Sequence, residues 1–367
     1  MPTLIPVYQP DLSGKELEYV TDCVKSGWVS SLGKYVELFE TSFAKFCGVK
    51  HAIALSNGTV ALHLALVLKD IGPGDEVIVP DLTFVATANV VRHTGATPVL
   101  VDSDPETWMI DPDQIEAKIT SKTKAIIPVH LYGHPANMGA IMKLAKKHGL
   151  YVIEDAAEAH GAEYRGKRVG GIGDIGAFSF YGNKVITTGE GGMLVTNDDL
   201  LAEKARFLKD HAMSKEIRYW HPEVGYNYRM TNIQAAIGLA QFERIDSLLS
   251  RKIEIALAYK KSLAGCRGVV VQPQAEWAKN IYWMFSILVT DESRLNRNEL
   301  MSSLLEQGID SRPFFFPIHQ MPPYLGCLGD YPVADDLSRR GINLPSFPAL
   351  KDEQVKYIGD TICRLCN

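Results

Sequence analysis

The chain has 367 residues, and its 38 basic and 43 acidic side chains give a net charge of -5. This length exceeds the roughly 100–200 residues of an ordinary domain and predicts two domains. The charge is mild and no run of lysine or arginine occurs, which argues against a nucleic-acid groove or a charged membrane patch and favours small-molecule partners.

The apolar stretches and the cysteines predict a cytoplasmic protein. No segment holds about 18 uninterrupted apolar residues, so we expect neither a membrane span nor a secretory leader. Six cysteines are scattered along the chain, which is typical of reduced thiols rather than of a disulfide framework. Cys363 and Cys366 form a Cys-x-x-Cys pair without a second pair at metal spacing, so we expect no metal site and two packing residues in a terminal helix.

Short apolar runs rich in valine and isoleucine alternate with longer stretches of helical period. The runs are 51–56, 76–80, 97–102, 124–130, 151–155, 176–180 and 192–196. Helical patterns such as 58–72 and 138–149 stand between them and stop at glycine. This alternation predicts an α/β fold, with a mainly parallel sheet covered by helices on both faces.

The regular alternation of apolar runs and helical stretches ends after a long helical pattern that covers residues 232–265. Strand and helix signals are mixed beyond it, with an apolar run at 282–290 and a helical pattern at 296–308. We therefore place a domain boundary near residue 245, which divides the chain into a large domain, 1–245, and a small domain, 246–367.

The first candidate site follows the strand that ends at Ser56. The chain there turns through Asn57, Gly58 and Thr59 into a helix. The free N–H groups at a helix start favour a phosphate, and a glycine lets that phosphate approach the backbone. Ordinary helix capping explains the same residues, so this motif alone leaves both interpretations open.

The second candidate site lies at the end of the apolar run "YVIED". Asp155 ends this run, and Glu158 follows three residues later. A carboxylate at a buried strand end is unfavourable unless it meets a cation or a strong donor, and a protonated ring nitrogen would serve. An aspartate that caps the next helix is the alternative.

The third candidate site is Lys184, in the stretch "FSFYGNKVITTGEGG". A lysine that forms an imine needs a neutral amine, and walls of low polarity lower its pKa. Phe178, Phe180 and Tyr181 can supply such walls, and Ser179 can add a hydroxyl group to a phosphate site. A structural lysine remains the alternative from this stretch alone.

Together the three sites predict binding of pyridoxal phosphate (PLP). The cofactor needs a phosphate cradle, a carboxylate for its ring nitrogen and a lysine for its aldehyde, and the chain has all three in loops of one predicted sheet. Phe84, in "PDLTFVATANV" after the second run, is a candidate to stack on the ring, although a phenylalanine there would also suit the core.

These motifs, in this order, resemble the DegT/DnrJ/EryC1/StrS sugar aminotransferases over nearly the whole chain. The segments that carry the resemblance are "GWVSSLGKYVELFE", "SNGTVALHLAL", "GPGDEVIVPDLTFVATANV", "GATPVLVD", "VIEDAAEAHGA", "FSFYGNKVITTGEGGM" and "GYNYRMTNIQAAIGLAQ". The resemblance implies a type I PLP-dependent aminotransferase fold. Such a fold has a large domain with a mostly parallel seven-stranded sheet and a smaller α+β carboxyl-terminal domain, and it forms homodimers with shared active sites.

The resemblance also implies roles for individual residues. Lys184 corresponds to the Schiff-base lysine and Asp155 to the partner of the pyridine nitrogen. The other implied cofactor ligands are Glu158 at the 3-hydroxyl group, Gly58, Thr59 and Ser179 at the phosphate, Phe84 on the ring, and Asn227 at the phosphate of the neighbouring subunit's cofactor. Near the sugar, the resemblance places His319, Arg312, Trp28 and Ser30, and Arg229 is a further candidate for a carboxylate or the nucleotide phosphates.

The implied reaction moves an amino group from L-glutamate to a nucleotide-linked keto sugar. The segments "RYWH", "SRPFFFPIH", "MPPY" and "GINLPSFPAL" most resemble the branch of the family that converts GDP-4-keto-6-deoxy-D-mannose to GDP-perosamine for O-antigen lipopolysaccharide. Departures from that branch include His160, which either fills space or alters the sugar pocket.

Other activities of the same fold remain as alternatives. They are amination of a dTDP- or UDP-linked sugar at C3 or C4, a PLP-dependent sugar dehydratase, and a non-catalytic PLP-binding protein. Related dehydratases carry histidine at the lysine position, so Lys184 favours transamination.

Overall fold

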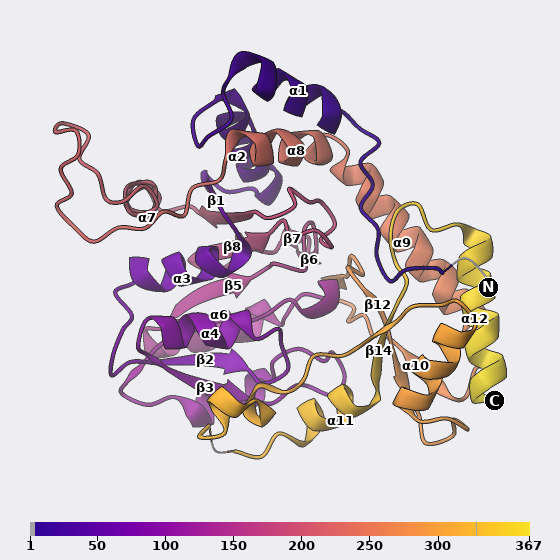
Figure 1. Cartoon of the computed structure of the whole chain (residues 1–367). Helices are drawn as coiled ribbons and strands as arrows, with labels where there is room; N and C mark the ends of the chain where they lie inside the picture. The colour runs from indigo at the N-terminus through magenta and orange to yellow at the C-terminus, as the bar shows by residue number, and fades with distance from the viewer. Residues whose placement is uncertain (1–3, 328) are drawn as a thin grey trace.

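The computed structural model describes residues 4–327 and 329–367, and its largest element is a seven-stranded sheet with the order β1-β9-β8-β5-β4-β2-β3 (Figure 1). Its strands are β1 (His51–Leu55), β2 (Glu76–Pro80), β3 (Thr97–Val101), β4 (Thr123–Ile126), β5 (Tyr151–Asp155), β8 (Ile175–Ser179) and β9 (Gly192–Thr196). All neighbouring pairs are parallel except the two that β9 makes with β1 and β8. The predicted α/β fold with a mostly parallel sheet is confirmed.

Helices cover this sheet because its strands are apolar on both faces. Strand β8, for example, is buried along its whole length. Helix α3 (Gly58–Leu68) packs on β8 and β9, α4 (Ala86–His93) on β2, and α6 (Met138–His148) on β5. A further layer of α1 (Glu16–Ser26), α2 (Lys34–Cys47) and α8 (Asn232–Phe242) lies beyond β1 (Figure 1).

Side chains protect the outer edge of β1, which has no further strand beside it in the sheet order. Glu40 of α2 accepts the N–H of Ala54 at 2.7 Å, and Lys209 donates to the Ala54 carbonyl at 2.9 Å. Arg206 of α7 (Asp199–Leu208) donates to the carbonyl of Ala52 at 3.4 Å. These contacts occupy groups that would otherwise pair with another chain.

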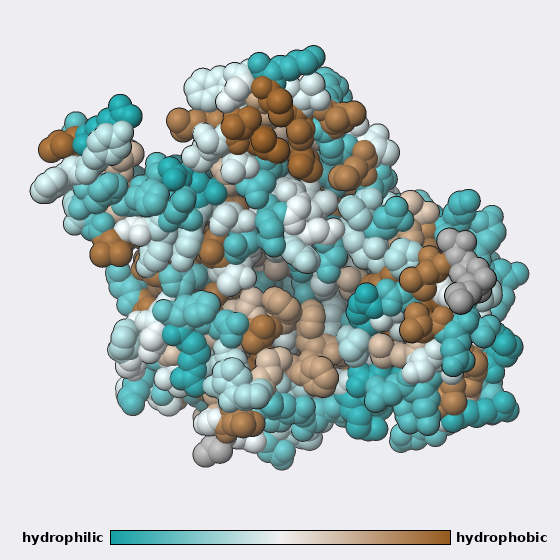
Figure 2. Space-filling view, in the orientation of Figure 1, coloured by the Kyte–Doolittle hydropathy of each residue, from teal (hydrophilic) through white to brown (hydrophobic). Residues whose placement is uncertain are grey.

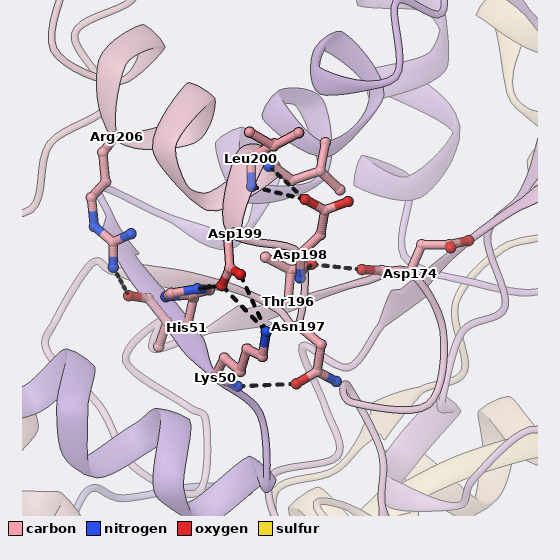
Figure 3. Close-up of polar contacts among 11 residues, drawn as sticks. Lys50, His51, Asp174, Thr196, Asn197, Asp198, Asp199, Leu200 and Arg206 are labelled. Carbon is pink, nitrogen blue, oxygen red and sulfur yellow. Dashed lines mark hydrogen bonds and ion pairs between the residues drawn. The ribbon is translucent and has the colours of Figure 1, made fainter.

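The start of helix α7 is fastened to the beginning of β1 (Figure 3). Asp198 caps the helix by accepting the N–H of Leu200 at 2.9 Å. Asp199 lies 2.7 Å from Nε2 of His51 and 3.2 Å from Nζ of Lys50. The cluster thereby joins the helix to the edge strand.

The carboxyl-terminal part of the chain forms a four-stranded antiparallel sheet, β10-β12-β14-β13. Its strands are β10 (Val269–Val271), β12 (Phe285–Val289), β13 (Arg312–Pro313) and β14 (Gly341–Leu344), and its helices are α9 (Ile245–Ser262), α10 (Arg297–Glu306) and α12 (Asp352–Cys366). This part surrounds a second hydrophobic core, to which Ile5 of the amino-terminal segment also contributes. It lies beside the large sheet, at the end toward which α9 runs (Figure 1).

Helix α9 contributes to both hydrophobic cores. Ile245, near its start, packs in the core of the large sheet, whereas Ile255 and Tyr259 pack in the second core. The division at residue 245 stays a prediction, and the helix that begins there is a shared element rather than a linker.

The remaining elements are short. They are α5 (Pro112–Ile115), η1 (Glu116–Lys118), η2 (Leu131–Gly133), β6 (Glu163–Tyr164), β7 (Lys167–Arg168), β11 (Ala278–Lys279), η3 (Ile318–Gln320), η4 (Pro322–Tyr324) and α11 (Pro332–Arg340). Within residues 4–327 and 329–367, no helix combines the length and the apolar character needed to cross a bilayer.

Candidate active site

A cavity of about 570 Å³ opens at the carboxyl ends of β2, β5 and β8, beside the first turn of α3. This edge is where an open α/β sheet usually binds its ligand. The cavity is lined by nine residues singled out from the sequence: Asn57, Gly58, Thr59, Phe84, Asp155, Glu158, Ser179, Tyr181 and Lys184. Phe178 and Phe180, which we expected as walls beside the lysine, are buried in the core and do not line the cavity. The three motifs therefore meet at one place, although they lie far apart in the chain.

Lys184 lies in the loop between β8 and β9, with its amine inside the cavity. Its Nζ is 3.6 Å from Oε1 of Glu158 and 3.8 Å from the centroid of the Trp283 ring. Burial lowers the pKa of Lys184, and the carboxylates of Glu158 and Asp155 oppose that shift. A lowered pKa makes the neutral amine more accessible, which is what imine chemistry requires.

Asp155 is the last residue of β5, and its carboxylate is fixed by two donors. The hydroxyl of Thr87 donates to Oδ2 at 2.7 Å, and the N–H of Ala157 donates to Oδ1 at 3.2 Å. Burial raises the pKa of Asp155, while these hydrogen bonds and the charge on Lys184 act in the opposite direction. A protonated nitrogen placed against this carboxylate would further favour its charged form.

Glu158 is buried opposite the amine of Lys184. The N–H of Tyr132 donates to its Oε2 at 2.8 Å, and Tyr132 has a positive φ of 53° at this point. Burial raises the pKa of Glu158 to about 7, against the lowering effects of Lys184 and of this hydrogen bond. The side chain can thus either donate or accept a hydrogen bond near neutral pH.

The first turn of α3 packs tightly against the end of β8. Asn57 caps the helix by accepting the N–H of Val60 at 2.9 Å. A Cβ atom at Gly58 would lie 2.7 Å from the Cβ of Ser179, so this position has room only for glycine. The first N–H groups of a helix have no partners within it, and here they flank the hydroxyl group of Ser179.

This arrangement fits the phosphate of PLP. It combines a helix start, a hydroxyl group and a close backbone approach, all beside the cavity that holds the lysine and the aspartate. The residues present therefore suit the three parts of the cofactor: its phosphate, its ring nitrogen and its aldehyde.

Aromatic side chains form the remaining walls of the cavity. Phe84 is about half exposed, and its ring lies 5.6 Å from that of Phe315. Phe315 stacks on Tyr132 at 5.4 Å, and the Tyr132 hydroxyl accepts the N–H of Phe315 at 3.1 Å. These contacts connect the loop after β2 with the segment that follows β13.

Sequence reasoning did not find Thr87, Tyr132 or Trp283 as parts of this site. Thr87 is a helix residue, Tyr132 belongs to the short segment η2, and Trp283 stands in an apolar run that is typical of a core strand. Thr87 lies within the quoted segment "PDLTFVATANV", but nothing in that segment marks it as a partner of Asp155, and Tyr132 and Trp283 lie outside the quoted segments, so only the fold identifies the three.

Asn227 and Arg229 do not line the cavity of their own chain. Arg229 donates from Nε to Oδ1 of Asn227 at 3.1 Å and pairs with Asp210 at 2.7 Å. Both residues belong to the segment that runs along the outer edge of β1, where Leu55 forms a bridge with Arg229.

The remaining sugar-site candidates also lie outside the cavity lining. Trp28 is exposed, and its backbone carbonyl accepts a hydrogen bond from the side-chain amide of Asn232 at 2.7 Å. The backbone carbonyl of Ser30 accepts the backbone N–H of the same asparagine at 2.5 Å. Arg312 is exposed and pairs with Asp310.

His319 is held by the buried carboxylate of Asp81. Nδ1 lies 2.7 Å from Oδ2 of Asp81, and the backbone N–H of His319 donates to Oδ1 at 2.9 Å. The ring also packs against that of Tyr331, with 4.9 Å between the centroids and a tilt of 30°.

His160 is fully buried behind the cavity. Its ring packs near those of Phe178 and Phe180, at 5.4 and 5.6 Å. Burial lowers the pKa of His160 to about 3, so the ring is neutral at physiological pH. The ring therefore packs within the aromatic core and does not line the cavity.

Comparison with known proteins agrees with this geometry. The family model for the DegT/DnrJ/EryC1/StrS aminotransferases matches residues 10–363. A protein of Escherichia coli O157:H7 named GDP-perosamine synthase is 53% identical over 98% of this chain and 97% of its own length. A protein of Caulobacter vibrioides with the same name is 50% identical over 96% of each chain. The PLP form of Spr1654 from Streptococcus pneumoniae superposes with a TM-score of 0.93, at 30% identity over 99% of this chain and 98% of that one.

Proposed function

We propose, since this chain belongs to the DegT/DnrJ/EryC1/StrS aminotransferase family, that it transfers an amino group from L-glutamate to C4 of GDP-4-keto-6-deoxy-D-mannose and so forms GDP-perosamine. It is a PLP-dependent nucleotide-sugar aminotransferase. The observation that carries the proposal is the buried amine of Lys184, 3.6 Å from Glu158, in a cavity that Asp155 and the start of α3 also line. The choice of GDP and of perosamine rests on the names of the two relatives that are about half identical to the chain.

The cofactor roles that we propose follow the cavity. Lys184 would hold the aldehyde carbon of PLP, Asp155 the pyridine nitrogen and Glu158 the 3-hydroxyl group. Gly58, Thr59 and Ser179 would bind the phosphate, and Phe84 would stack on the ring. When bound, PLP supplies an electron sink for the carbon that loses its proton.

In this proposal Lys184 moves the protons of both half-reactions. Its neutral amine takes a proton from the α-carbon of L-glutamate, and its ammonium form returns a proton to C4 of the sugar. Asp155 keeps its partner nitrogen protonated throughout, because a buried carboxylate favours an adjacent positive charge. The aromatic walls exclude water from the amine.

A homodimer with shared active sites is part of the proposal, with Asn227 reaching the cofactor phosphate of the neighbouring subunit. Support comes from apolar side chains exposed between residues 12 and 38, namely Leu12, Leu17, Val24, Trp28, Val29, Leu32 and Leu38. Figure 2 shows hydrophobic surface gathered over the layer that contains α1. A second copy of the chain would cover this surface.

His319, Arg312, Trp28, Ser30 and Arg229 remain our proposed contacts for the sugar nucleotide. Their support is the family resemblance of the segments around them. We also place the enzyme in the cytoplasm, because all six of its cysteines are free, as a reducing compartment would keep them.

A substrate comparison tests the proposal. The purified enzyme, loaded with PLP and given excess L-glutamate, would be offered the GDP-, dTDP- and UDP-linked 4-keto-6-deoxy sugars separately, and each product identified by mass spectrometry and NMR. We expect an amino sugar from the GDP substrate at a kcat/KM at least about tenfold above the others, equivalent to a difference of about 1.4 kcal/mol in transition-state binding. Preference for another nucleotide would overturn the GDP assignment and leave the family unchanged.

A further inference from the structure

The indole of Trp283 contacts the Lys184 segment at two points. Its Nε1 donates to the carbonyl of Asn183 at 2.7 Å, and this carbonyl belongs to the peptide bond that leads into Lys184. Its ring centroid lies 3.8 Å from Nζ of Lys184. One side chain, itself only 4% exposed, thus touches both the backbone and the amine of the same lysine.

A buried lysine fixes the main chain of Trp283 in turn. Nζ of Lys252, on α9, donates to the Trp283 carbonyl at 2.8 Å, to the Ser346 carbonyl at 2.6 Å and to the Ser346 hydroxyl group. An ammonium group has three donors, and each of these has an acceptor here. Among the residues that the structure describes, no carboxylate forms an ion pair with Lys252. The contacts of Lys252 therefore fix the backbone of Trp283.

The groups around the amine of Lys184 are of two kinds. Glu158 lies 3.6 Å away, Asp155 attracts the ammonium form from the end of β5, and the buried imidazole of His160 lies behind. On the other side stands the indole face, with the Tyr132 ring nearly parallel to it at 6.4 Å and 20°. An aromatic face attracts a cation placed over it, and tryptophan does so most strongly.

We propose that Trp283 is a positioning residue for Lys184: its ring face holds Nζ and stabilises the charged amine, and its N–H group fixes the peptide bond before the lysine. This inference rests on the proposed function for the role of Lys184 in catalysis. The contacts themselves belong to the folded chain. They hold the amine of Lys184 at one position whenever it is not bonded to the cofactor. On one side lie the carboxylates of Glu158 and Asp155, which attract its charged form, and on the other lies the indole of Trp283, which excludes water.

The test measures the acid dissociation constant of the Lys184 amine in the full-length, cofactor-free protein. Competitive labelling with acetic anhydride across a pH series modifies only neutral amines, and mass spectrometry of the peptide that contains residue 184 gives the labelled fraction. The exposed Lys261 is the internal standard. The variants are Trp283→Leu, which removes the ring, and Trp283→Phe, which keeps a ring face without the donor. Trp277→Phe is the control, since Trp277 packs on Tyr164 and His134 instead.

Loss of the ring should lower the pKa of Lys184. We expect the acid dissociation constant to rise about 2- to 30-fold in Trp283→Leu, less in Trp283→Phe, and not at all in Trp277→Phe. An unchanged or raised pKa in Trp283→Leu would overturn the inference, because the indole would then act as packing alone. If that variant does not fold, Trp283→Phe decides, and a wild-type value there overturns the inference as well. The measurement needs neither cofactor nor sugar substrate, so its result does not depend on whether the proposed reaction is correct.

Discussion

Two carboxylates of the cavity have different environments and therefore suit different tasks. Asp155 is held by two donors at the end of a strand, whereas Glu158 has one backbone donor and the amine of Lys184 as its neighbours. The pKa of Glu158 reaches about 7, so this residue can change its protonation state at working pH. Asp155 is the better partner for a permanent positive charge.

Replacement of Asp155 by asparagine should leave the fold intact and impair catalysis. The amide keeps the size of the carboxylate but loses the negative charge that would hold a ring nitrogen protonated. We expect kcat to fall about 10²-fold or more, with an unchanged circular dichroism spectrum. Asp102→Asn is the matched control, since Asp102 is buried and accepts three backbone N–H groups outside the cavity, from Ser103, Val333 and Ala334. Wild-type kinetics in Asp155→Asn would remove Asp155 from the proposed role.

Replacement of Glu158 by glutamine should stabilise the cofactor-free protein, and only at higher pH. The pKa of Glu158 is raised from 4.5 to about 7 in the folded state. A raised carboxyl pKa means that the folded state binds its proton more tightly, so stability falls as pH rises from about 4.5 to about 7. The neutral glutamine escapes that loss. Urea denaturation should therefore show a gain of about 1–3 kcal/mol at pH 8 that disappears at pH 4.5, and a gain independent of pH would contradict this account.

At the scale of elements, helix α3 and strand β8 approach so closely that their contact leaves no space for a side chain. A methyl group at Gly58 would push against Ser179, with 2.7 Å between the two Cβ atoms. Because both residues flank the proposed phosphate site, the packing of the two elements and the binding of the cofactor depend on the same glycine.

Gly58→Ala should weaken cofactor binding more than it affects the fold. The displaced helix start would no longer present its N–H groups beside Ser179, and we expect the dissociation constant for PLP to rise about tenfold or more. Gly72→Ala is the control, because a Cβ there would meet its nearest atom at 3.6 Å, in ordinary contact. Fluorescence titration of both variants gives the constants, and equal affinities would argue against a phosphate at the α3 start.

The sequence predicts elements well where one period holds over a whole segment. All seven apolar runs correspond to strands of the large sheet, because a strand covered on both faces needs a continuous apolar run. The run 124–130 is shorter as a strand, and β4 ends at Ile126, two residues before Pro128, which has no N–H group for a ladder.

The site could be predicted only in part. Gly58, Asp155 and Lys184 stand in local motifs at strand ends, so their convergence follows from the parallel sheet. Trp283 touches Lys184 from about one hundred residues away and Tyr132 meets Glu158 through a left-handed turn, and neither relation has a local signal. The resemblance implies that Asn227 serves the neighbouring subunit, and in the folded chain Asn227 lies outside its own cavity, in the segment along β1.

The whole molecule combines a large sheet that carries the proposed cofactor site with a smaller carboxyl-terminal part that completes its walls. Phe315 and Trp283 come from the carboxyl-terminal part, and Lys252 holds Trp283 from the shared helix α9. The cavity therefore depends on the relative position of the two parts. Beyond one chain, the proposed dimer adds Asn227 of a second copy.

Mixed dimers test whether Asn227 of one subunit serves the active site of the other. Lys184→Ala homodimers should be inactive, and Asn227→Ala homodimers should bind PLP more weakly. A heterodimer of the two variants would contain one site with both Lys184 and Asn227 intact, so mixing should restore activity if the site is shared. Size-exclusion chromatography checks that dimers form. The assay uses a PLP concentration that saturates the wild-type enzyme but not Asn227→Ala homodimers, and no recovery from mixed dimers at that concentration would contradict a phosphate ligand supplied by the neighbouring subunit.

The most direct test of the central claim is to find which lysine holds the cofactor. The enzyme would be loaded with PLP, reduced with borohydride and digested, and the pyridoxyl-labelled peptide sequenced by mass spectrometry. We predict a single label on Lys184, and its loss when L-glutamate is added before the reduction. A label on another lysine, such as the buried Lys252, or a label on Lys184 that glutamate does not remove, would contradict the account.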